Sequence, residues 1–442
     1  MTRHARRRTA RRAALGAAAL TLAAPLLATS AASAATTAPA VDAAPAVGAG
    51  PEPEQRASSG LPGTPVAPIN PVDLGPRGYQ AVAVNDRADV LLAPDWTTGS
   101  EPLSWVSLAS GRHAPPTPLP PPPAWENGPD LNLRLVFTAF LNNSGQIAVN
   151  EYAPQANLWR PLILHRGRWV VPTTRYQPMY VVDLNDRGEA LIVTWSAGTS
   201  AVELWRDGQS TLVHEYATVG SPPYSSPALA VNNLGEVAGT KLVSGPDGVR
   251  SQAFRWARGQ TTDLPTPAGG ESAATGINDR GQIAGTVTAA DGSDHAVRWD
   301  GSRLTDLGTL GGRHSQAALG RGTQGRSIND AGQVVGVSQT ADGAHRPFLW
   351  SGGRMRDIGT PEWDYRPGGT LGVDDIGGVV GTASMPDGAV TWLWRAGRTH
   401  ELLPGPEANG VILADFSGRG LVVGFGSGPD GLRALAWRVT SP

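Results

Sequence analysis

The stretch INDRGQIAGTVTAADGSDHAVRWDGSRLTDLGTLGG, residues 277–312, decides the fold of this 442-residue chain. Short runs of apolar and β-branched residues alternate in it with turn signals. Asn278-Asp279-Arg280-Gly281 suits a type I turn that ends in a left-handed residue, and Asp291-Gly292 and Asp300-Gly301 mark two further turns. Three tight turns separate four strands, so the stretch predicts one four-stranded antiparallel meander.

The same pattern recurs eight times along the chain. The first turn of each copy is Asn-Asp-x-Gly or a relative of it, and consecutive copies lie about 47 residues apart. A second marker, usually tryptophan, follows this turn by 17 to 21 residues. The turns begin at residues 85, 142, 185, 232, 278, 329, 374 and 417; the second markers are Trp105, His165 with Trp169 close by, Trp205, Trp256, Trp299, Trp350, Trp394 and Trp437. Two markers in phase over eight copies indicate an internal repeat.

The repeat predicts an all-β fold, a closed β-propeller with eight four-stranded blades. One meander cannot bury both of its faces, whereas radial repetition packs sheet on sheet around an axis. The first strand of each copy would be innermost, and the recurring tryptophan would fill the wedge between two blades. Seven blades are an alternative if the divergent first copy lies outside the ring. An open β-solenoid is another, although solenoid coils are usually shorter than this repeat.

The two ends of the repeat region predict how the ring closes. The last copy stops after its third strand, at about Val439, and lacks a fourth strand. An unmatched fourth-strand pattern, Pro71-Val-Asp-Leu-Gly75, precedes the first copy. We expect this N-terminal strand to complete the last blade, which would remove two open sheet edges at once.

The N-terminal part of the chain predicts export. Residues 1–34 have a basic start, an apolar run and an Ala-Ser-Ala cleavage site, as in a secretory signal peptide, and Arg11-Arg12 also fits a twin-arginine signal. Residues 35–68 are rich in Ala and Pro and predict a disordered linker. Residues 69–442 form the predicted propeller. With no lipobox cysteine and no hydrophobic C-terminal anchor, we expect a freely secreted, extracellular protein.

The composition excludes several classes of function. The chain has no cysteine, which rules out disulfides, thiolate chemistry and cysteine-ligated metals. Its formal net charge is −2, but six arginines fall within the first twelve residues, so the chain after the signal carries about −8. This charge argues against binding to nucleic acid or to an anionic membrane. We expect a monomer.

The stretch 277–312 resembles the HAF-repeat family of extracellular bacterial repeat proteins. The resemblance rests on Asn278-Asp279, Gly281-Gln282, His295-Ala296-Val297, Trp299 and Asp306-Leu-Gly-Thr-Leu-Gly-Gly312. The copy at residues 328–359 matches nearly as well, and the match is clear over about residues 226–400. The family implies secretion and a repeat scaffold. It implies no reaction and brings no catalytic residues to this chain.

No local motif points to catalysis, a cofactor or a metal. The chain has no G-x-S-x-G elbow, Walker loop or H-E-x-x-H pattern, so we expect no cofactor and do not expect an enzyme. The Asn-Asp pairs lack the alternating oxygens of a calcium loop. His295 and His345 occupy positions that we take as equivalent in neighbouring copies, but the few, scattered histidines predict no zinc site.

The links from a fourth strand to the next first strand carry the candidate binding residues. In a meander these links share one face of the ring with the turns between second and third strands. Exposed aromatic rings mixed with charged groups suit stacking on sugar rings or anchoring a protein. The candidate ligand-binding residues are Trp363, Asp364, Tyr365, Arg366, Arg313, His314, Trp125 and Tyr224.

Two functions fit this surface. The first is a secreted binding scaffold that recognises a glycan or a protein through the aromatic links. The alternative is an extracellular propeller hydrolase or lyase with a site in the central funnel, because propeller enzymes gather residues from different blades. Paired carboxylates in the funnel would favour the enzyme, and an aromatic platform without them would favour the scaffold.

Overall fold

The computed structural model describes the repeat region of the chain. The described residues are 66–75, 77–95, 102–109, 115–123, 135–153, 158–196, 199–217, 229–245, 248–267, 270–319, 326–359, 365, 371–385, 388–405, 408–428 and 431–438. The predicted signal peptide and all but the last three residues of the predicted linker lie outside them. Throughout the described ranges the secondary structure is strand and turn, and no helix there could cross a membrane.

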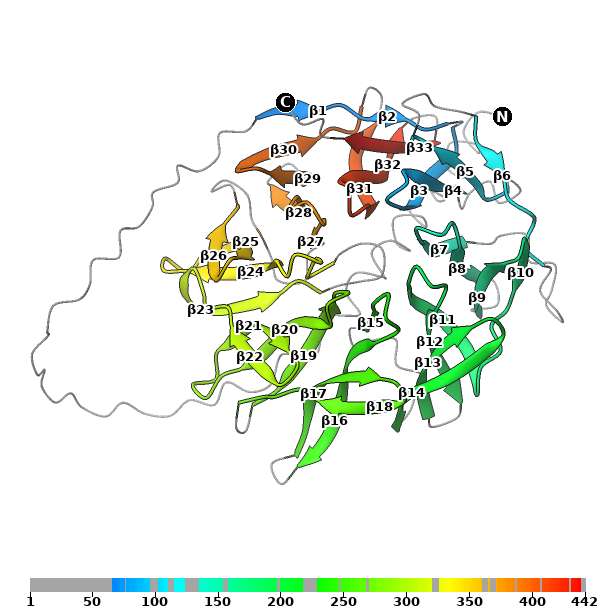
Figure 1. The fold of residues 1–442 in the computed structure, drawn as a ribbon. Coiled ribbons are helices and arrows are strands. Elements are labelled where there is room, and N and C mark those ends of the chain that lie inside the picture. The colour runs from blue at the N-terminus through cyan, green and yellow to red at the C-terminus, as the bar shows by residue number, and fades with distance from the viewer. Residues whose placement is uncertain are drawn as a thin grey trace, which may run out of the picture. The chain divides into compact units, whose positions relative to one another are not determined.

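Eight β-sheets, numbered as blades 1 to 8 in chain order, surround a common axis (Figure 1). Blade 1 contains β3 (Tyr79–Val84), β4 (Asp89–Pro94), β5 (Ser104–Ser107) and β6 (Thr117–Pro118); blade 2 contains β7 (Leu135–Leu141), β8 (Ile147–Ala153), β9 (Leu158–His165) and β10 (Arg168–Val170). Blade 3 contains β11 (Gln177–Leu184), β12 (Ala190–Ser196), β13 (Thr199–Arg206) and β14 (Gln209–Ala217); blade 4 contains β15 (Ala230–Val231), β16 (Val237–Gly245), β17 (Gly248–Ala257) and β18 (Gln260–Asp263).

The second half of the ring continues the pattern. Blade 5 contains β19 (Ser272–Ile277), β20 (Gln282–Thr288), β21 (Asp294–Asp300) and β22 (Arg303–Asp306); blade 6 contains β23 (Gly311–Ala317), β24 (Val334–Thr340), β25 (His345–Ser351) and β26 (Arg354–Asp357). Blade 7 contains β27 (Leu371–Val373), β28 (Val379–Met385), β29 (Gly388–Arg395), β30 (Arg398–Leu402) and, as a fifth strand, β1 (Val66–Ile69); blade 8 contains β31 (Asn409–Phe416), β32 (Leu421–Gly428), β33 (Gly431–Arg438) and β2 (Val72–Asp73). The prediction of an all-β propeller with eight blades is confirmed.

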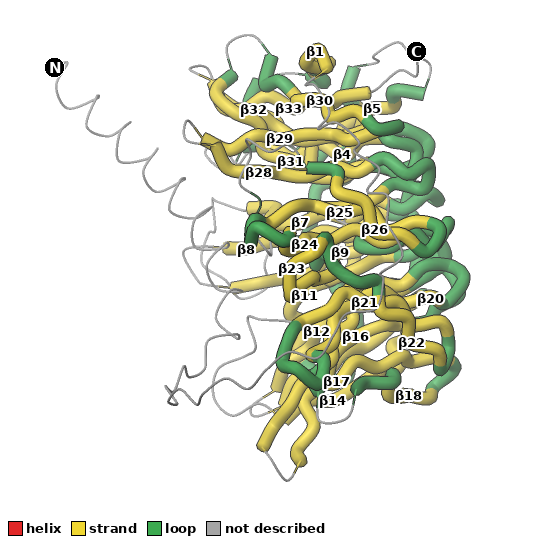
Figure 2. Tube along the Cα trace, turned by 90° about the vertical axis from the view of Figure 1, so that its left-hand side faces the viewer, coloured by secondary structure: helices red, strands yellow, loops and turns green. Residues whose placement is uncertain are grey.

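Each blade is an antiparallel meander whose strands we call a to d from the axis outward. We call the end of the ring that carries the a–b turns the turn face, and the opposite end, which carries the b–c turns and the d–a links, the link face. Figure 2 shows the strands running between these two ends, with green turns along one side of the ring.

The a–b turn has the predicted geometry. In blade 5, the Gly281 N–H donates to Asn278 O at 3.0 Å, and Gly281 is left-handed with a φ of +72°. Asn278 Oδ1 accepts hydrogen bonds from the backbone N–H groups of Arg280 and Gln282. The last turn residue is left-handed in all eight blades, at positions 88, 145, 188, 235, 281, 332, 377 and 420. The repeated tetrapeptide is therefore turn chemistry, as its sequence indicates.

The turn asparagines also join neighbouring blades. Asn278 Nδ2 donates to the backbone oxygen of Asn329, the equivalent residue of blade 6, at 2.9 Å. The residue after the asparagine adds a second bond between blades, as where the Asn233 N–H donates to Asp279 Oδ1 at 2.8 Å. Asparagines in five other blades make the same bond to the next blade: Asn85, Asn142, Asn185, Asn232 and Asn329.

Among the described residues, one apolar cluster lies at each of the eight interfaces between blades. Between blades 4 and 5, Trp299 is fully buried and its Nε1 donates to Pro265 O of blade 4 at 2.8 Å. Gly285 on strand b makes room for the indole, because a Cβ there would lie 2.5 Å from the Trp299 ring. Trp299 is the wedge residue that the repeat predicts.

In blade 1 the predicted wedge residue, Trp105, is not the residue that fills the wedge. Trp299 pairs with Ile283 across strands b and c, and the equivalent pair in blade 1 is Val90 with Val106. Trp105 is therefore one residue out of register, and a shift of one residue turns a side chain to the other face of a sheet. Val106 is buried in the wedge, whereas Trp105 is 37% exposed.

In blade 2 the predicted wedge residue, His165, does not fill the wedge either. The equivalent pair there is Ile147 with Leu164, so His165 faces away from the wedge. Trp169 on strand d packs into the interface between blades 1 and 2 instead. Its Nε1 donates to Pro120 O of blade 1 at 2.7 Å, which reproduces the bond that Trp299 makes. A tryptophan from the neighbouring strand thus replaces the missing wedge residue.

The ring closes as predicted, through β2. Val72 pairs with Ala436 and Asp73 with Leu435, and the Leu74 N–H donates to the backbone oxygen of Ala434 at 2.9 Å. Leu74 is fully buried in the cluster between blades 8 and 1. Upstream of it, β1 pairs in parallel with β30 of blade 7, so strand structure begins at Val66, inside the range predicted as linker.

Deletion of residues 69–76 should strongly destabilise the protein. It removes the fourth strand of blade 8 and the buried Leu74 side chain, and we expect the free energy of unfolding to fall by at least about 3 kcal/mol. Urea unfolding of parent and variant measures this change. Leu74→Ala should reproduce much of the loss, while Val72→Ala, at a position that is 53% exposed, should change little. Parent-like stability of the deletion variant would contradict closure through β2.

Register also predicts the effect of removing two tryptophans. Trp299→Ala should lower the free energy of unfolding by about 3–5 kcal/mol, because it empties a buried wedge. Trp105→Ala should cost less, about 1–2 kcal/mol, because Trp105 is 37% exposed and does not fill the wedge. Equilibrium unfolding monitored by far-ultraviolet circular dichroism compares the two variants. Equal losses would show that the register given for blade 1 is incorrect.

Candidate functional site

Three of the eight predicted binding residues lie among the described residues; Trp125, Tyr224, Trp363, Asp364 and Arg366 lie outside them and stay predictions. Arg313 and His314 lie on the inner strand β23 and contact the b–c turn of blade 5. The exposed Arg313 donates from Nη2 to the backbone oxygen of Asp291 at 3.3 Å, and His314 Nδ1 accepts from the Asp294 N–H at 3.2 Å. These two residues connect blades 5 and 6 on the link face.

The predicted exposure of Tyr365 is wrong. Its side chain is only 3% exposed and belongs to the cluster between blades 6 and 7. The ring stands edge-on to Trp392, with the ring centroids 5.9 Å apart. Polar neighbours in the sequence suggested a surface residue, but apolar side chains of both blades surround it. Tyr365 supports the link from inside and does not offer its ring to a ligand.

Blade 5 brings a serine, a histidine and an aspartate together. Ser293 Oγ lies 3.2 Å from His295 Nε2, and His295 Nδ1 lies 2.7 Å from Asp306 Oδ2. These contacts have the order of a nucleophile, a base and an orienting acid. No local sequence motif marks this group, because its members lie on the b–c turn, strand c and strand d.

The group lacks an available nucleophile. Ser293 is 1% exposed, and its hydroxyl donates to Asp291 Oδ1 at 2.5 Å. A neutral His295 that donates to Asp306 from Nδ1 can only accept at Nε2. The single hydroxyl proton of Ser293 already lies toward Asp291, so it is not available to the histidine.

The pair of His295 and Asp306 is instead a repeated element of the scaffold. In blade 8, Arg433 and Asp73 occupy the same positions on strands c and d, 3.6 Å apart. His345 does not take part: counted from its tryptophan it aligns with Asp294, so the predicted equivalence of the two histidines is wrong by one residue. In these two blades a histidine or an arginine on strand c thus contacts an aspartate at the end of strand d.

Two carboxylates on inner strands also join blades. Asp183 Oδ2 accepts from the Val231 N–H of blade 4, and Asp415 Oδ2 accepts from the Val84 N–H of blade 1, each at 2.8 Å. Each carboxylate accepts a second bond from the N–H of the next residue in its own strand. Burial among the inner strands raises the pKa of Asp183 to about 6 and that of Asp415 well above its usual range. Each carboxylate accepts a hydrogen bond from a backbone N–H of the next blade, and the two do not form a pair of catalytic carboxylates.

Blade 3 departs from the repeat on the link face. Its outer strand β14 has nine residues, whereas β18, β22 and β26 have four each. Glu203 on β13 is 1% exposed and holds the link 171–176 against this longer sheet. Its two oxygens accept from the Arg175 N–H at 2.9 and 3.0 Å and from the hydroxyls of Thr194 and Ser210 at 3.1 and 2.6 Å. The buried carboxylate is therefore fully hydrogen-bonded.

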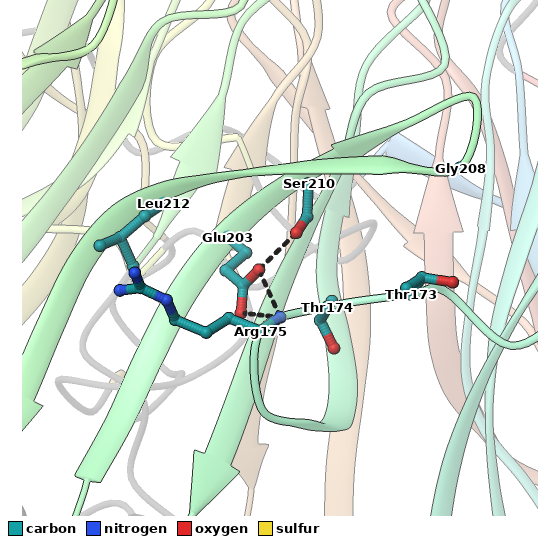
Figure 3. A pocket seen from close by; sticks show the side chains of 7 residues that line it. All are labelled: Thr173, Thr174, Arg175, Glu203, Gly208, Ser210 and Leu212. Carbon is teal, nitrogen blue, oxygen red and sulfur yellow. Dashed lines mark hydrogen bonds between the residues drawn. The ribbon is translucent and has the colours of Figure 1, made fainter.

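A cavity of about 370 Å³, which we call the blade 3 pocket, lies between this link and the outer strands (Figure 3). Arg175 Nη1 donates to Glu215 Oε1 at 2.9 Å, and Tyr176 donates its hydroxyl to the same oxygen at 2.8 Å. Leu212 adds an apolar side chain that is 37% exposed. The lining residues are Thr173, Thr174, Arg175, Glu203, Gly208, Ser210 and Leu212.

The pocket can hydrogen-bond a polar ligand. The hydroxyl protons of Thr174 and Ser210 already go to Tyr176 O and Glu203 Oε2, so these two hydroxyls can accept hydrogen bonds from a ligand. The Arg175 guanidinium can donate, and Leu212 offers apolar contact. Sequence reasoning missed these residues, because link and strands contribute to the pocket from positions up to 39 residues apart. The one signal available in the sequence was the long alternating segment of strand d in this copy, which sets blade 3 apart from its neighbours.

Metal binding finds no support among the described side chains, because no three histidines or acids there are grouped so as to hold an ion. The described residues therefore contain two groups of reactive side chains that serve the scaffold, and an open polar pocket in blade 3.

The Asp183 carboxyl should make stability depend on pH. Because burial raises its pKa from 3.8 to about 6, the folded state favours the protonated form. Its contribution is fully present below about pH 4 and is lost as the pH rises to about 6. Asp183→Asn should remove this slope, and because its Nδ2 cannot accept one of the two N–H bonds that the carboxyl oxygens accept, the free energy of unfolding at pH 4 should fall by about 1–2 kcal/mol. Urea unfolding at pH 4 and pH 7 measures the free energy of unfolding of parent and variant. Asp300→Asn, at an exposed position, is the control. If parent and Asp183→Asn show the same pH dependence, Asp183 is not its source.

Comparison with known proteins shows no family for this chain. No family model and no curated protein matches the chain, so the resemblance to the HAF-repeat family stays a prediction. Similar solved structures include an acylaminoacyl peptidase of Pyrococcus horikoshii, which is 11% identical over 69% of this chain and 51% of that chain, with a TM-score of 0.43. A puromycin-hydrolysing peptidase of Mycobacterium tuberculosis is 14% identical over 82% of this chain and 62% of that chain, with a TM-score of 0.43. TolB of Acinetobacter baumannii is 9% identical over 69% of this chain and 80% of that chain, with a TM-score of 0.34. The chain spans between half and two thirds of the length of the two peptidases.

Proposed function

We propose that this chain is an extracellular binding protein that recognises a saccharide at the blade 3 pocket. The observation that carries the proposal is the pocket itself, in which hydroxyl groups and a guanidinium surround a cavity beside an exposed leucine. Sugars present hydroxyls around an apolar face of C–H groups, and such a lining complements both. The export signal predicted for residues 1–34 supports a site of action outside the cell.

The hydrogen bonds around Glu203 support a preformed site. The link is held through the backbone N–H of Arg175, so its side chain is not needed to keep the link in place. The Arg175 guanidinium is 55% exposed and is oriented by Glu215. A side chain that is oriented before binding loses less entropy when a ligand arrives.

An array of mono- and oligosaccharides tests the proposal. The array should include glucose, N-acetylglucosamine, and their α- and β-linked oligomers up to six units. The secreted protein should bind at least one series, and titration calorimetry then measures its affinity. Arg175→Ala and Leu212→Ala should each weaken binding about tenfold, because each removes a ligand contact and leaves the bonds to Glu203 intact.

Arg303→Ala is the matched control for these variants. Arg303 is an exposed arginine on the outer strand of blade 5 and lies outside the pocket. It should bind with parental affinity. Absence of binding to every sugar on the array would contradict the proposed function, and parental affinity of both pocket variants would place the sugar elsewhere.

A further inference from the structure

The link-face end of blade 3 carries a transverse row of paired residues that no other described blade has. Gln177 pairs with Trp195, Trp195 with Ser200, and Ser200 with Tyr216, so the row crosses all four strands. We call it the blade 3 row. It exists because β14 extends to this end of the sheet, whereas the outer strands of blades 4 to 6 end earlier.

The row faces blade 4, on the opposite side of the sheet from the blade 3 pocket. Directly paired residues point to one face of a sheet, and residues two positions along a strand share that face. Val193 and Val202, two positions inward from Trp195 and Ser200, pack in the cluster between blades 3 and 4. Consistent with this, the Tyr216 hydroxyl donates to the backbone oxygen of Thr240 in blade 4 at 3.3 Å.

Two buried polar atoms of the row have no hydrogen-bond partner. They are Trp195 Nε1 and Ser200 Oγ, which belong to directly paired residues, and Ser200 is only 2% exposed. In blade 5 the same positions hold Thr288 and Asp294, and there the Thr288 hydroxyl donates to Asp294 Oδ1 at 3.2 Å. Buried polar groups in proteins are nearly always paired, so two unpaired ones side by side need an explanation.

We infer that the blade 3 row is a second saccharide subsite, and that the protein therefore binds an oligosaccharide laid across the end of blade 3. The inference rests on the proposed function. Trp195 and Tyr216, both partly exposed, supply rings for stacking, and Trp195 Nε1 and Ser200 Oγ supply two donors for sugar oxygens. Arg175 and Gln177 are nearly adjacent in the chain, so the Arg175 end of the pocket lies near the row, while its other end, at Gly208 and Ser210, lies at the c–d turn.

Ser200 is 2% exposed and is paired directly with Trp195, so a sugar can reach its hydroxyl only if neighbouring side chains move, and we expect the Trp195 ring to be among them. Binding should therefore change the fluorescence of Trp195, and Trp195→Phe should abolish that change while keeping a ring for stacking. The chain contains 14 tryptophans, so the signal is taken as the difference between parent and Trp195→Phe.

The test measures affinity against the number of sugar units. Titration calorimetry of the full chain uses the array-selected series of glucose or N-acetylglucosamine oligomers, from one to six units. In the parent, affinity should rise once the oligomer reaches the second subsite. Ser200→Ala should weaken binding of the long oligomers about fivefold and Trp195→Ala about tenfold, with the monomer unaffected.

Stability provides an independent readout. Removing an unpaired hydroxyl should leave the melting temperature of Ser200→Ala unchanged or higher, whereas Thr288→Ala in blade 5, which breaks a made bond, should lower it without affecting binding. A lower melting temperature for Ser200→Ala would show that its hydroxyl has a structural partner and would overturn the inference.

The two proposals fail in different ways. If short sugars bind and depend on Arg175, but affinity does not rise with length or is unchanged in both row variants, the pocket stands and the second subsite is wrong. If no sugar binds, both are wrong.

Discussion

The ring depends on one repeated side chain, the asparagine that opens the a–b turn in six of the eight blades. In blade 5, Asn278 Oδ1 closes its own turn through two backbone N–H groups, and its Nδ2 satisfies a buried carbonyl of blade 6. One amide thus sets both the shape of a blade and its angle to the next. Aspartate has no N–H to donate, and serine is too short to do both. A net hydrogen bond contributes only about 1 kcal/mol, and the neighbour's carbonyl also accepts the N–H of its own turn glycine. The effect on the ring therefore comes from repetition of the bond at six interfaces.

The asparagine bonds stop where the chain ends meet, and other groups take over. Blade 7 has Asp374 in place of asparagine, and this carboxylate binds Arg395 of its own blade. The Asp375 N–H donates to Gly418 O instead, and Asp415 accepts the Val84 N–H to join blade 8 to blade 1. Together with β2, these contacts show that closure needs no fixed chemistry, provided that each buried backbone group at the interface finds a partner.

The sequence predicted the blades, their strand order and the closing strand, because each depends on residues close together in one copy. It was less successful where pairing across strands decides the outcome. Trp105 lies one residue from the wedge position, which spacing along the chain cannot resolve but register does. Tyr365 has polar neighbours in sequence and apolar neighbours in space. The blade 3 pocket and row could not be predicted, because their residues come from four strands and share no spacing.

Residues that bond to a neighbouring blade belong to the scaffold, whereas the candidate binding residues pair mainly within their own blade. On the turn face, the side chains of Asn278 and Asp279 both take part in bonds between blades, so a substitution there alters a turn and an interface together. At the link-face end of strand c and along strand d, residues such as Ser200 and Leu212 pair mainly within their own sheet. A blade can therefore lengthen a strand or change a link there without disturbing its neighbours. Blade 3 has done so, and it can keep two unpaired donors because the asparagine bonds and wedge clusters hold its position.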